Sequence, residues 1–599
     1  MNRIVRVELI WLSLLITACC AINFIWIVQD TRPQPLIDPY SQKTLEFIDG
    51  VKIHGLTDLP RLLNNLAVGP RPPLYQLLAV PSVLIFGRSA DSILLVNIFF
   101  LAVLLLSTYG IGKLAGNGKV GLLAVLLVAT YPPISNLVKI ARPHSILPAC
   151  AALILWLLLL LLDSRSQRIA WFLGLSIGFG VLVHPNLLYF IAFPSLGVGL
   201  YIILFQSEPK LPTGIKNFPI WMLDKAREPF VWKGLLPCVI LAIVIILPWY
   251  GSNYSRFLNL IQHSAGHWSK IRVGFNNVPA SFWWYALTMP GAVSYLFAGL
   301  LAVSLVVNII RKQAYPRLLA VLFIIMYVGI ALRKGALAWM TAAPLLPLAG
   351  VLSALLLVEI NDVTISPRFP GPVKRLWRLF TGFLLILYIG AGIYIFSVIT
   401  WGIPAGCTPV TRALGAPLDT ACHWRMTVAF CPNPPRAEDW RMSDILQTIL
   451  DDWGVRKEEC SLAVVSTSVE NFNQSTLKFH LARDLPGAGM KIKRLERWDG
   501  QPRLNWLTSD YLVYIPEFGR GIYSKKVMSF LEAPPSVFSQ AHLKLASFSL
   551  PNNRTAILIK RTGPLSLEEA VTSIKALDIP RNLREQLFGR VKGMLGREN

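Results

Sequence analysis

Long apolar runs alternate with short polar loops over the first two-thirds of the chain and stop near residue 400. The first run covers 7–28, which is about the length that an α-helix needs to cross the hydrocarbon core of a bilayer. Later runs lie at 91–113, 119–134, 145–162, 169–184, 187–206, 234–252, 285–310, 316–332, 339–358 and 379–400. Because helices satisfy their own backbone hydrogen bonds in lipid, the pattern predicts an all-α membrane domain of about eleven transmembrane helices over residues 1–400.

The charges between the runs predict how these helices are oriented. The first run follows Arg3 and Arg6, is too long for a signal-peptide core and lacks a small-residue cleavage site, so we expect an uncleaved span that leaves the cytoplasm. The loops assigned to the inside then carry most of the Lys and Arg residues, with exceptions at 139–142, 270–272 and 333–334. An odd number of spans places the C-terminal residues outside the cytoplasm, and we expect them in the periplasm of a bacterial inner membrane.

The segment 73–87 (PLYQLLAVPSVLIFG) is the weak point of this topology. It is apolar, but it is short and begins with proline, so we expect it to be interfacial or re-entrant. Counted as a further span, it would move the C-terminal residues to the cytoplasm.

Residues 401–599 are mixed in polarity and predict a small soluble α/β domain outside the membrane. Runs rich in β-branched and aromatic residues predict strands within 461–468, 511–515 and 555–560. Apolar residues at helical spacing predict a helix over 438–453, and Ser566 with the acidic residues after it predicts the start of another helix over 567–577. The predicted domains are therefore 1–400, with a first extracytoplasmic loop over 29–88, and 401–599.

The cysteines also favour a location of the C-terminal domain outside the cytoplasm. Four of the eight cysteines, Cys407, Cys422, Cys431 and Cys460, follow the last predicted span. Four cysteines in one polar segment suggest two disulfides and hence an oxidising environment. Their spacing does not match a zinc ribbon or finger, so we expect no metal site. The sequence requires no cofactor; a divalent metal is compatible with the chemistry below, but no residue pattern supports one.

The net charge of +24, from 57 basic and 33 acidic residues, does not indicate nucleic-acid binding. No nucleic-acid-binding motif accompanies it, and the basic residues cluster in the loops between apolar runs, as expected of a membrane protein.

The long loop over 29–88 is the first candidate for chemistry. It contains Asp30, Asp38, Glu46, Asp49 and Asp58. A carboxylate held at the membrane surface beside an aromatic side chain could deprotonate a hydroxyl group. For any one of these acids, a solvated loop charge is the simpler interpretation.

A resemblance to a known family rests on short motifs and their order along the chain. The motifs are Asp38-Pro-Tyr40, Arg71-Pro-Pro-Leu-Tyr75, Ile85-Phe-Gly87, the run AVLLVATYPP at 124–133, Leu247-Pro-Trp-Tyr250, and Arg333 followed by WMTAAPLLP at 339–347. Together these motifs, spread over about residues 1–400, resemble the polyprenyl-phosphate-dependent glycosyltransferases of the GT-C fold. This family includes protein O-mannosyltransferases and the lipid A aminoarabinose transferase.

The resemblance implies transfer of a hexose or pentose from a polyprenyl phosphate to an extracytoplasmic lipid, glycan or protein. Asp38 is then the candidate base. The leaving phosphate needs cations rather than a proton donor, and Arg71, Lys139, Arg142, Arg333 and Lys334 could supply them. The other candidate substrate-binding residues are Tyr40, Tyr75, His144 and His184. The alternative roles are snorkelling of the cations to the membrane surface and purely structural histidines.

The sequence also departs from this family. Many relatives have an Asp-Glu pair where this chain has Asp38-Pro39, and many have His where Arg71 stands. Two alternative functions therefore remain: a transporter or flippase for lipid-linked sugars, and a non-catalytic scaffold with a degenerate site. No internal repeat of the kind found in many transporters is evident in the sequence.

Overall fold

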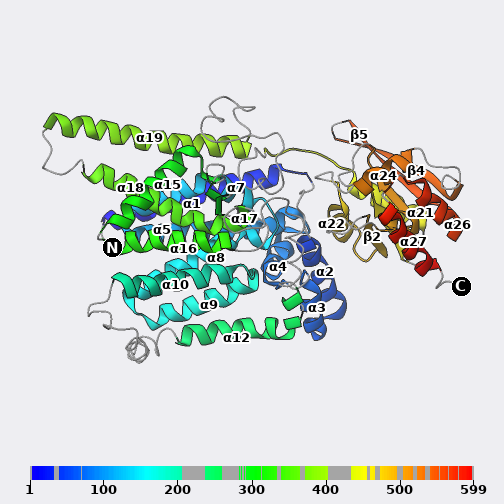
Figure 1. Cartoon of the computed structure of the whole chain (residues 1–599), viewed down its shortest axis with the longest axis horizontal. Helices are drawn as coiled ribbons and strands as arrows, with labels where there is room; N and C mark the ends of the chain where they lie inside the picture. Colours follow the sequence, from blue (N-terminus) through cyan, green and yellow to red (C-terminus); the bar gives the residue numbers. More distant parts are fainter. Residues whose placement is uncertain are drawn as a thin grey trace. The chain divides into compact units, whose positions relative to one another are not determined.

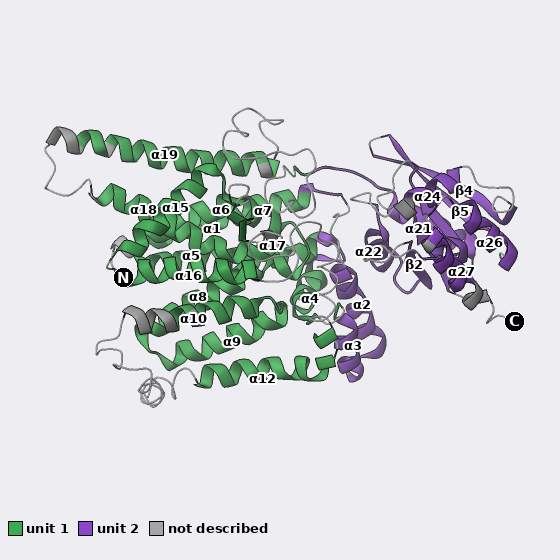
Figure 2. Cartoon of the chain, viewed as in Figure 1, with its two compact units in different colours: residues 1–28, 67–85, 91–435 green, residues 29–66, 86–90, 436–599 purple. Residues whose placement is uncertain are grey.

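A computed structural model gives the structure of this protein (Figure 1). It describes residues 3–32, 39–68, 71–205, 236–255, 257–259, 282–283, 285–286, 289, 292–311, 313–332, 339–363, 371–401, 434–454, 459–465, 472–495, 503–516, 522–532, 540–551, 553–563, 566–577, 579 and 581–595. The chain divides into two compact units (Figure 2). Unit 1 comprises Met1–Val28, Ala67–Ile85 and Asp91–Pro435, and unit 2 comprises Gln29–Leu66, Phe86–Ala90 and Arg436–Asn599.

Among the described residues, the regular elements of unit 1 are all helices. Its helices are α1 (Arg3–Gln29), α4 (Leu74–Phe86), α5 (Ala90–Ala115), α6 (Gly118–Thr130), α7 (Pro132–Val138), η2 (Pro143–Ser145), α8 (Leu147–Ser164), α9 (Gln167–Val183), α10 (Leu187–Phe205), α12 (Leu236–Ser252), α15 (Tyr295–Ile310), α16 (Ala314–Leu332), α17 (Trp339–Ala342), η5 (Ala343–Leu345), α18 (Leu346–Val363) and α19 (Gly371–Trp401). The long helices run alongside one another (Figure 1). This arrangement confirms the predicted helical membrane domain.

Six helices among the described residues are long and apolar enough to cross a membrane, or seven if the bent pair α6–α7 counts as one span. Four shorter apolar helices, α4, α9, α12 and α15, accompany them. The chain is therefore a multi-pass membrane protein, whereas the count of eleven spans stays a prediction.

The predicted span over 119–134 is bent by 67° between α6 and α7. Tyr131 at the bend is extended (φ −68°, ψ 126°), and Pro132 and Pro133 follow it. Proline lacks an N–H donor and disfavours helical backbone in the residue before it, so α6 ends at Thr130 and a new helix begins in a different direction.

The core of unit 1 centres on α18, whose Leu346, Leu348, Val351 and Leu352 are fully buried. It packs against α6 and α15, two of its neighbours in the bundle. Close approach of backbones depends on small residues: a Cβ on Gly112 of α5 would lie only 2.8 Å from the Cα of Gly121 in α6. Small residues at such points are typical of packed helices in membranes, where close van der Waals contact holds the bundle together.

Unit 2 combines the first long loop with the C-terminal domain. The loop contributes α2 (Pro39–His54), η1 (Leu56–Asp58) and α3 (Leu59–Leu66). The C-terminal domain contributes α21 (Met442–Trp453), β1 (Cys460–Val464), α22 (Gln474–Asp484), β2 (Met490–Arg494), α23 (Asn505–Thr508), β3 (Tyr511–Tyr514), α24 (Ile522–Glu532), β4 (His542–Leu550), β5 (Arg554–Arg561), α26 (Leu567–Ala576) and α27 (Arg581–Leu595). This domain confirms the predicted small α/β fold.

The five strands form one mixed sheet in the order β2-β1-β3-β5-β4. Strand β1 pairs in parallel with β2 and β3, whereas β5 pairs antiparallel with β3 and β4. Leu462 of β1 packs with α21 and α22 on one face, and the next residue, Ala463, packs with α24, α26 and α27 on the other. Burial on both faces explains why the central strands are apolar almost throughout.

The loop helix α2 packs against α22 of the C-terminal domain. Arg88 joins them: its guanidinium donates to both carboxylate oxygens of Asp49 in α2 at 2.5 and 2.8 Å, and to the carbonyl of Ala482 in α22 at 2.6 Å. Just after α1, the carboxylate of Asp30 accepts from the N–H of Arg436 at 3.1 Å. The loop over 29–66 thus belongs to the same compact unit as the domain from 436 onward, although the two are far apart in sequence.

Cys460 is a free, fully buried thiol at the start of β1. Its place inside the sheet is that of a small apolar residue, and burial raises the pKa of its thiol to about 11. No candidate partner of Cys460 lies among the described residues, so the expected disulfides stay a prediction. The other three candidates, Cys407, Cys422 and Cys431, lie outside the described residues.

Candidate functional site

The segment between α7 and α8 in unit 1 is held in place by a buried asparagine. The side-chain amide of Asn97 in α5 donates to the carbonyls of Val138 and Ile140, both at 2.9 Å. Its carbonyl oxygen accepts from the hydroxyl of Tyr75 in α4 at 3.2 Å. Asn97 and Tyr75 are both buried, so one polar cluster fixes the backbone on either side of Lys139.

Lys139 is a buried cation within this segment, with only 1% of its surface exposed. Its ammonium lies 4.5 Å from the centre of the Trp26 ring in α1. An aromatic face stabilises a positive charge that has lost water, which allows the charge to stay inside the protein. An ionisable residue buried in a membrane protein is expected to have a functional role.

Two histidines from different parts of the sequence meet next to this segment. His144 in η2 and His184 at the C-terminal end of α9 are both buried, with ring centres 4.2 Å apart. The Nδ1 atom of His184 accepts from the backbone N–H of Asn186 at 3.0 Å, which leaves Nε2 as the ring nitrogen that can carry a proton. Arg142, half-buried, precedes η2 by one residue. The stretch 139–144 thus carries a lysine, an arginine and an imidazole group, and the end of α9 adds a second imidazole in contact with the first.

Two further elements, α17 and α4, lie next to this region. The short helix α17, which begins at Trp339, contacts both α7 and η2. Arg71, half-buried, forms an isolated β-bridge with Val68 just before α4, the helix that carries Tyr75. Positive charge and hydrogen-bond donors are the groups that bind a phosphate.

Comparison with known proteins adds to this geometry. The model of the dolichyl-phosphate-mannose-protein mannosyltransferase family matches residues 70–215, a range that contains Arg71, Tyr75, Lys139, His144 and His184. No curated protein sequence matches the chain.

Solved structures match over nearly the whole chain. ArnT from Cupriavidus metallidurans bound to undecaprenyl phosphate has 13% identity and a TM-score of 0.52, over 92% of this chain and 98% of that one. Its apo state has 13% identity and a TM-score of 0.53, over 92% and 97%. The apo oligosaccharyltransferase of Archaeoglobus fulgidus has 11% identity and a TM-score of 0.49, over 86% and 71%. The two ArnT matches show that the chain has the GT-C fold.

Within this GT-C fold, the predicted site residues fall into three groups. Tyr75, Arg142, His144 and His184 belong to unit 1, where η2 and the end of α9 bring the two histidines together. Tyr40 is fully buried in α2 of unit 2, where its carbonyl accepts from the hydroxyl of Thr44. Asp38, Arg333 and Lys334 lie outside the described residues, so their roles stay predictions.

Sequence reasoning missed two residues of the site, Asn97 and Trp26. Asn97 could have been found from the sequence, because it is an amide inside an apolar run. Such residues are rare in membrane helices and usually have a structural or functional role. Trp26 gave no such signal, because tryptophan near the end of a span is ordinary at a membrane interface. Among the residues that the structure describes, no three His, Cys, Asp or Glu side chains gather in a way that could hold a metal ion.

Proposed function

We propose that this protein is a membrane glycosyltransferase that moves one sugar from a polyprenyl phosphate to an acceptor outside the cytoplasm. The observation that carries this proposal is the segment 139–144, with its buried Lys139 and the contact of buried His144 with His184, in the region that matches the mannosyltransferase family model. A protein of the same fold, ArnT from Cupriavidus metallidurans, has been solved with undecaprenyl phosphate bound.

The leaving group explains the need for buried cations. When the bond between the anomeric carbon and the phosphate oxygen breaks, the bond electrons stay on a phosphate that gains one negative charge. A lipid phosphate is already a stable anion, so positive charge rather than a proton stabilises the transition state. Lys139 and Arg142, together with Arg71, Arg333 and Lys334, are the cations that we assign to this role.

The acceptor side of the reaction needs a base. As the hydroxyl oxygen of the acceptor bonds to the anomeric carbon, its proton must leave, and we assign Asp38 to receive it. The assignment rests on the position of Asp38 before Tyr40 in the first long loop and on the family resemblance of that motif. We further propose that the sugar is a hexose or a pentose, and that transfer takes place on the periplasmic side of a bacterial inner membrane.

The decisive experiment compares wild type with Asp38→Asn, both purified into lipid nanodiscs. Radiolabelled polyprenyl-phosphate sugars are supplied as donors with crude membrane extract as the source of acceptors. We expect wild type to transfer label and Asp38→Asn to lose transfer while keeping its folded yield. Asp58→Asn, which changes another carboxylate of the same loop, is the matched control and should transfer like wild type.

Each alternative function predicts a different result. If Asp38→Asn transferred sugar as fast as wild type, Asp38 would not be the base. A transporter would move the labelled lipid across the bilayer of a sealed vesicle without changing it, and a scaffold would do neither. The fold match to ArnT does not favour either alternative.

A further inference from the structure

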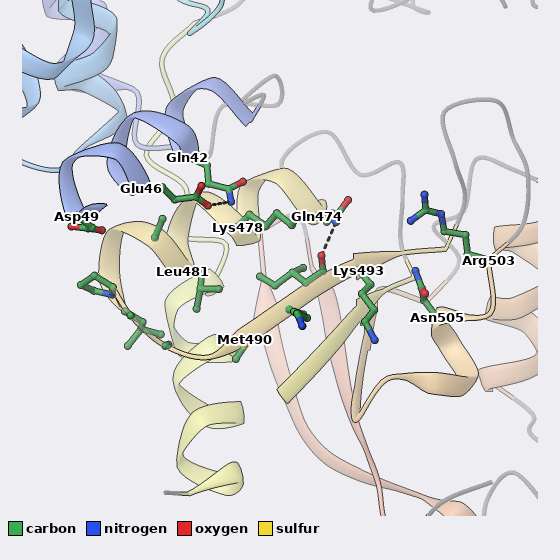
Figure 3. A pocket seen from close by; sticks show the side chains of 17 residues that line it. Gln42, Glu46, Asp49, Gln474, Lys478, Leu481, Met490, Lys493, Arg503 and Asn505 are labelled. Atoms are coloured by element: carbon green, nitrogen blue, oxygen red, sulfur yellow. Dashed lines mark hydrogen bonds between the residues drawn. The ribbon is translucent and has the colours of Figure 1, made fainter. Parts of the chain in front are cut away.

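Unit 2 contains a cavity of about 700 Å³ that the proposed reaction does not use (Figure 3). Its walls are α2 from the first long loop, α22 and the loop that follows it, strand β2, and the segment around Arg503 and Asn505. All of these elements belong to unit 2, and α2 and α22 pack directly against each other. The cavity thus lies where the loop meets the C-terminal domain.

The acidic residues of this cavity are already paired. Asp49 is held by Arg88. Glu46 accepts from the ammonium of Lys43 at 2.8 Å and from the side-chain amide of Gln42. Their negative charge is therefore largely compensated within their own surroundings.

Two of its lysines are not paired in this way. Among the described residues, Lys478 and Lys493 form no ion pair, and both are partly buried. By contrast, Lys491 on the same strand pairs with Glu459. Burial lowers the pKa of Lys478, an effect that Glu46 partly offsets, and burial also lowers the pKa of Lys493. Cations that have lost water without forming an ion pair are sites where an external anion binds favourably.

Side-chain amides line the same space. Gln474 donates to the carbonyl of Ile492 at 2.7 Å, and Asn505 donates to the carbonyl of Arg494 at 2.6 Å. Both carbonyls belong to β2, which is an edge strand of the sheet. Figure 3 shows Lys493, Arg503 and Asn505 at one end of the cavity, and Lys478 beside Gln42 and Glu46 at the other. Amides next to separated cations suit a ligand that carries both hydroxyl groups and negative charge.

We propose that this cavity binds an anionic saccharide, which Lys478 and Lys493 recognise through its negative charge and the amides of Gln474 and Asn505 through its hydroxyl groups. The proposal rests on the proposed function, since it assigns an acidic glycan as the class of acceptor. A carboxylate or a phosphate on the sugar would supply the charge.

The test measures binding to the full-length protein in nanodiscs with no sugar donor present. The probes are tri-galacturonic acid as the carboxylate form, glucose 6-phosphate as the phosphate form, and neutral maltotriose. We expect an acidic probe to bind, to bind more weakly at high salt, and to bind about tenfold more weakly or worse to the double variant Lys478→Gln/Lys493→Gln. Preference for one acidic probe over the other identifies the anion.

Two further variants separate charge from folding. Lys544→Gln/Lys575→Gln removes the same charge from exposed positions of the same domain, away from the cavity, and should bind like wild type. Lys478→Arg/Lys493→Arg keeps the charge and should retain binding. Equal binding of maltotriose, or no binding of either acidic probe, would overturn the proposal.

The proposed function fails separately from this site. If the protein bound an acidic probe but transferred no sugar, the proposed transferase activity would be overturned and the proposed saccharide site would stand. If the wild type transferred sugar but the double variant bound acidic probes as tightly as wild type, only the proposed saccharide site would be overturned.

Discussion

At the scale of single residues, Asn97 shows how one buried amide can organise a site. It makes three hydrogen bonds to groups in α4 and the 138–140 segment. Asn97→Leu leaves two carbonyls and one hydroxyl buried without it, so we expect a loss of about 2–4 kcal/mol in the free energy of unfolding. Tyr75→Phe removes one of the three bonds and should cost about 1 kcal/mol. Thermal unfolding in nanodiscs measures both, and equal effects would contradict the central role of Asn97.

Lys139 is the residue whose charge the proposed mechanism needs most directly. Lys139→Met keeps an unbranched side chain of nearly the same length but removes the ammonium that lies over the Trp26 ring. If the ammonium stabilises the leaving phosphate, sugar transfer should fall by about 10²–10³-fold, the usual effect of losing one such group. The radiolabel assay measures it, with Lys119→Met, an exposed lysine of unit 1, as the control. Transfer within twofold of wild type would assign Lys139 a structural role.

At the scale of elements, α21 and α22 are joined by a network around Asp484. Burial favours its neutral form, but hydrogen bonds from His480, Arg483 and Ser443 outweigh burial and hold the pKa of Asp484 well below its usual range. A carboxyl whose pKa is lower in the folded state stabilises the fold above its unfolded pKa of about 4 and loses that effect as the pH falls. The C-terminal domain should therefore lose stability as the pH falls from about 5 towards 2.

In a background where the other cysteines are replaced by alanine, the buried thiol of Cys460 provides the measurement for this pH dependence, because it then reacts with dithiodipyridine only when β1 is exposed. We expect the urea concentration needed for half-reaction to fall with pH in wild type. Asp484→Asn should be less stable at pH 7, by about 1 kcal/mol for a partly exposed group, and should vary less with pH. Asp451→Asn, an exposed carboxylate of α21, should behave like wild type. A parallel pH dependence in wild type and Asp484→Asn would rule out this network as its source.

The elements also show what the sequence could and could not predict. Central strands β1, β3 and β5 lie within or next to the predicted runs because burial on both faces requires continuous apolar sequence. The edge strands β2 and β4 were missed, since lysine, serine and histidine residues break their apolar pattern. In the site, His144 and His184 could each be named from the sequence, but their contact depends on how η2 and α9 pack. Periodicity carries no information about such pairings.

At the scale of the whole molecule, the orientation of the C-terminal domain depends on α4. This helix has 13 residues, most of them apolar, which is fewer than the roughly 20 that span a bilayer without thinning it. The eleven-span topology leaves it out and places the domain outside the cytoplasm. Alkaline phosphatase fused after Asn599 should then be active, because it folds only outside the cytoplasm, and green fluorescent protein at the same point should stay dark. The control fusion after Gln313, in a loop predicted to be inside, should give the opposite pair of results. If at Asn599 the fluorescent-protein fusion glowed and the phosphatase fusion were inactive, α4 would cross the membrane. The acidic-saccharide cavity would then face the cytoplasm, where an extracytoplasmic acceptor could not reach it.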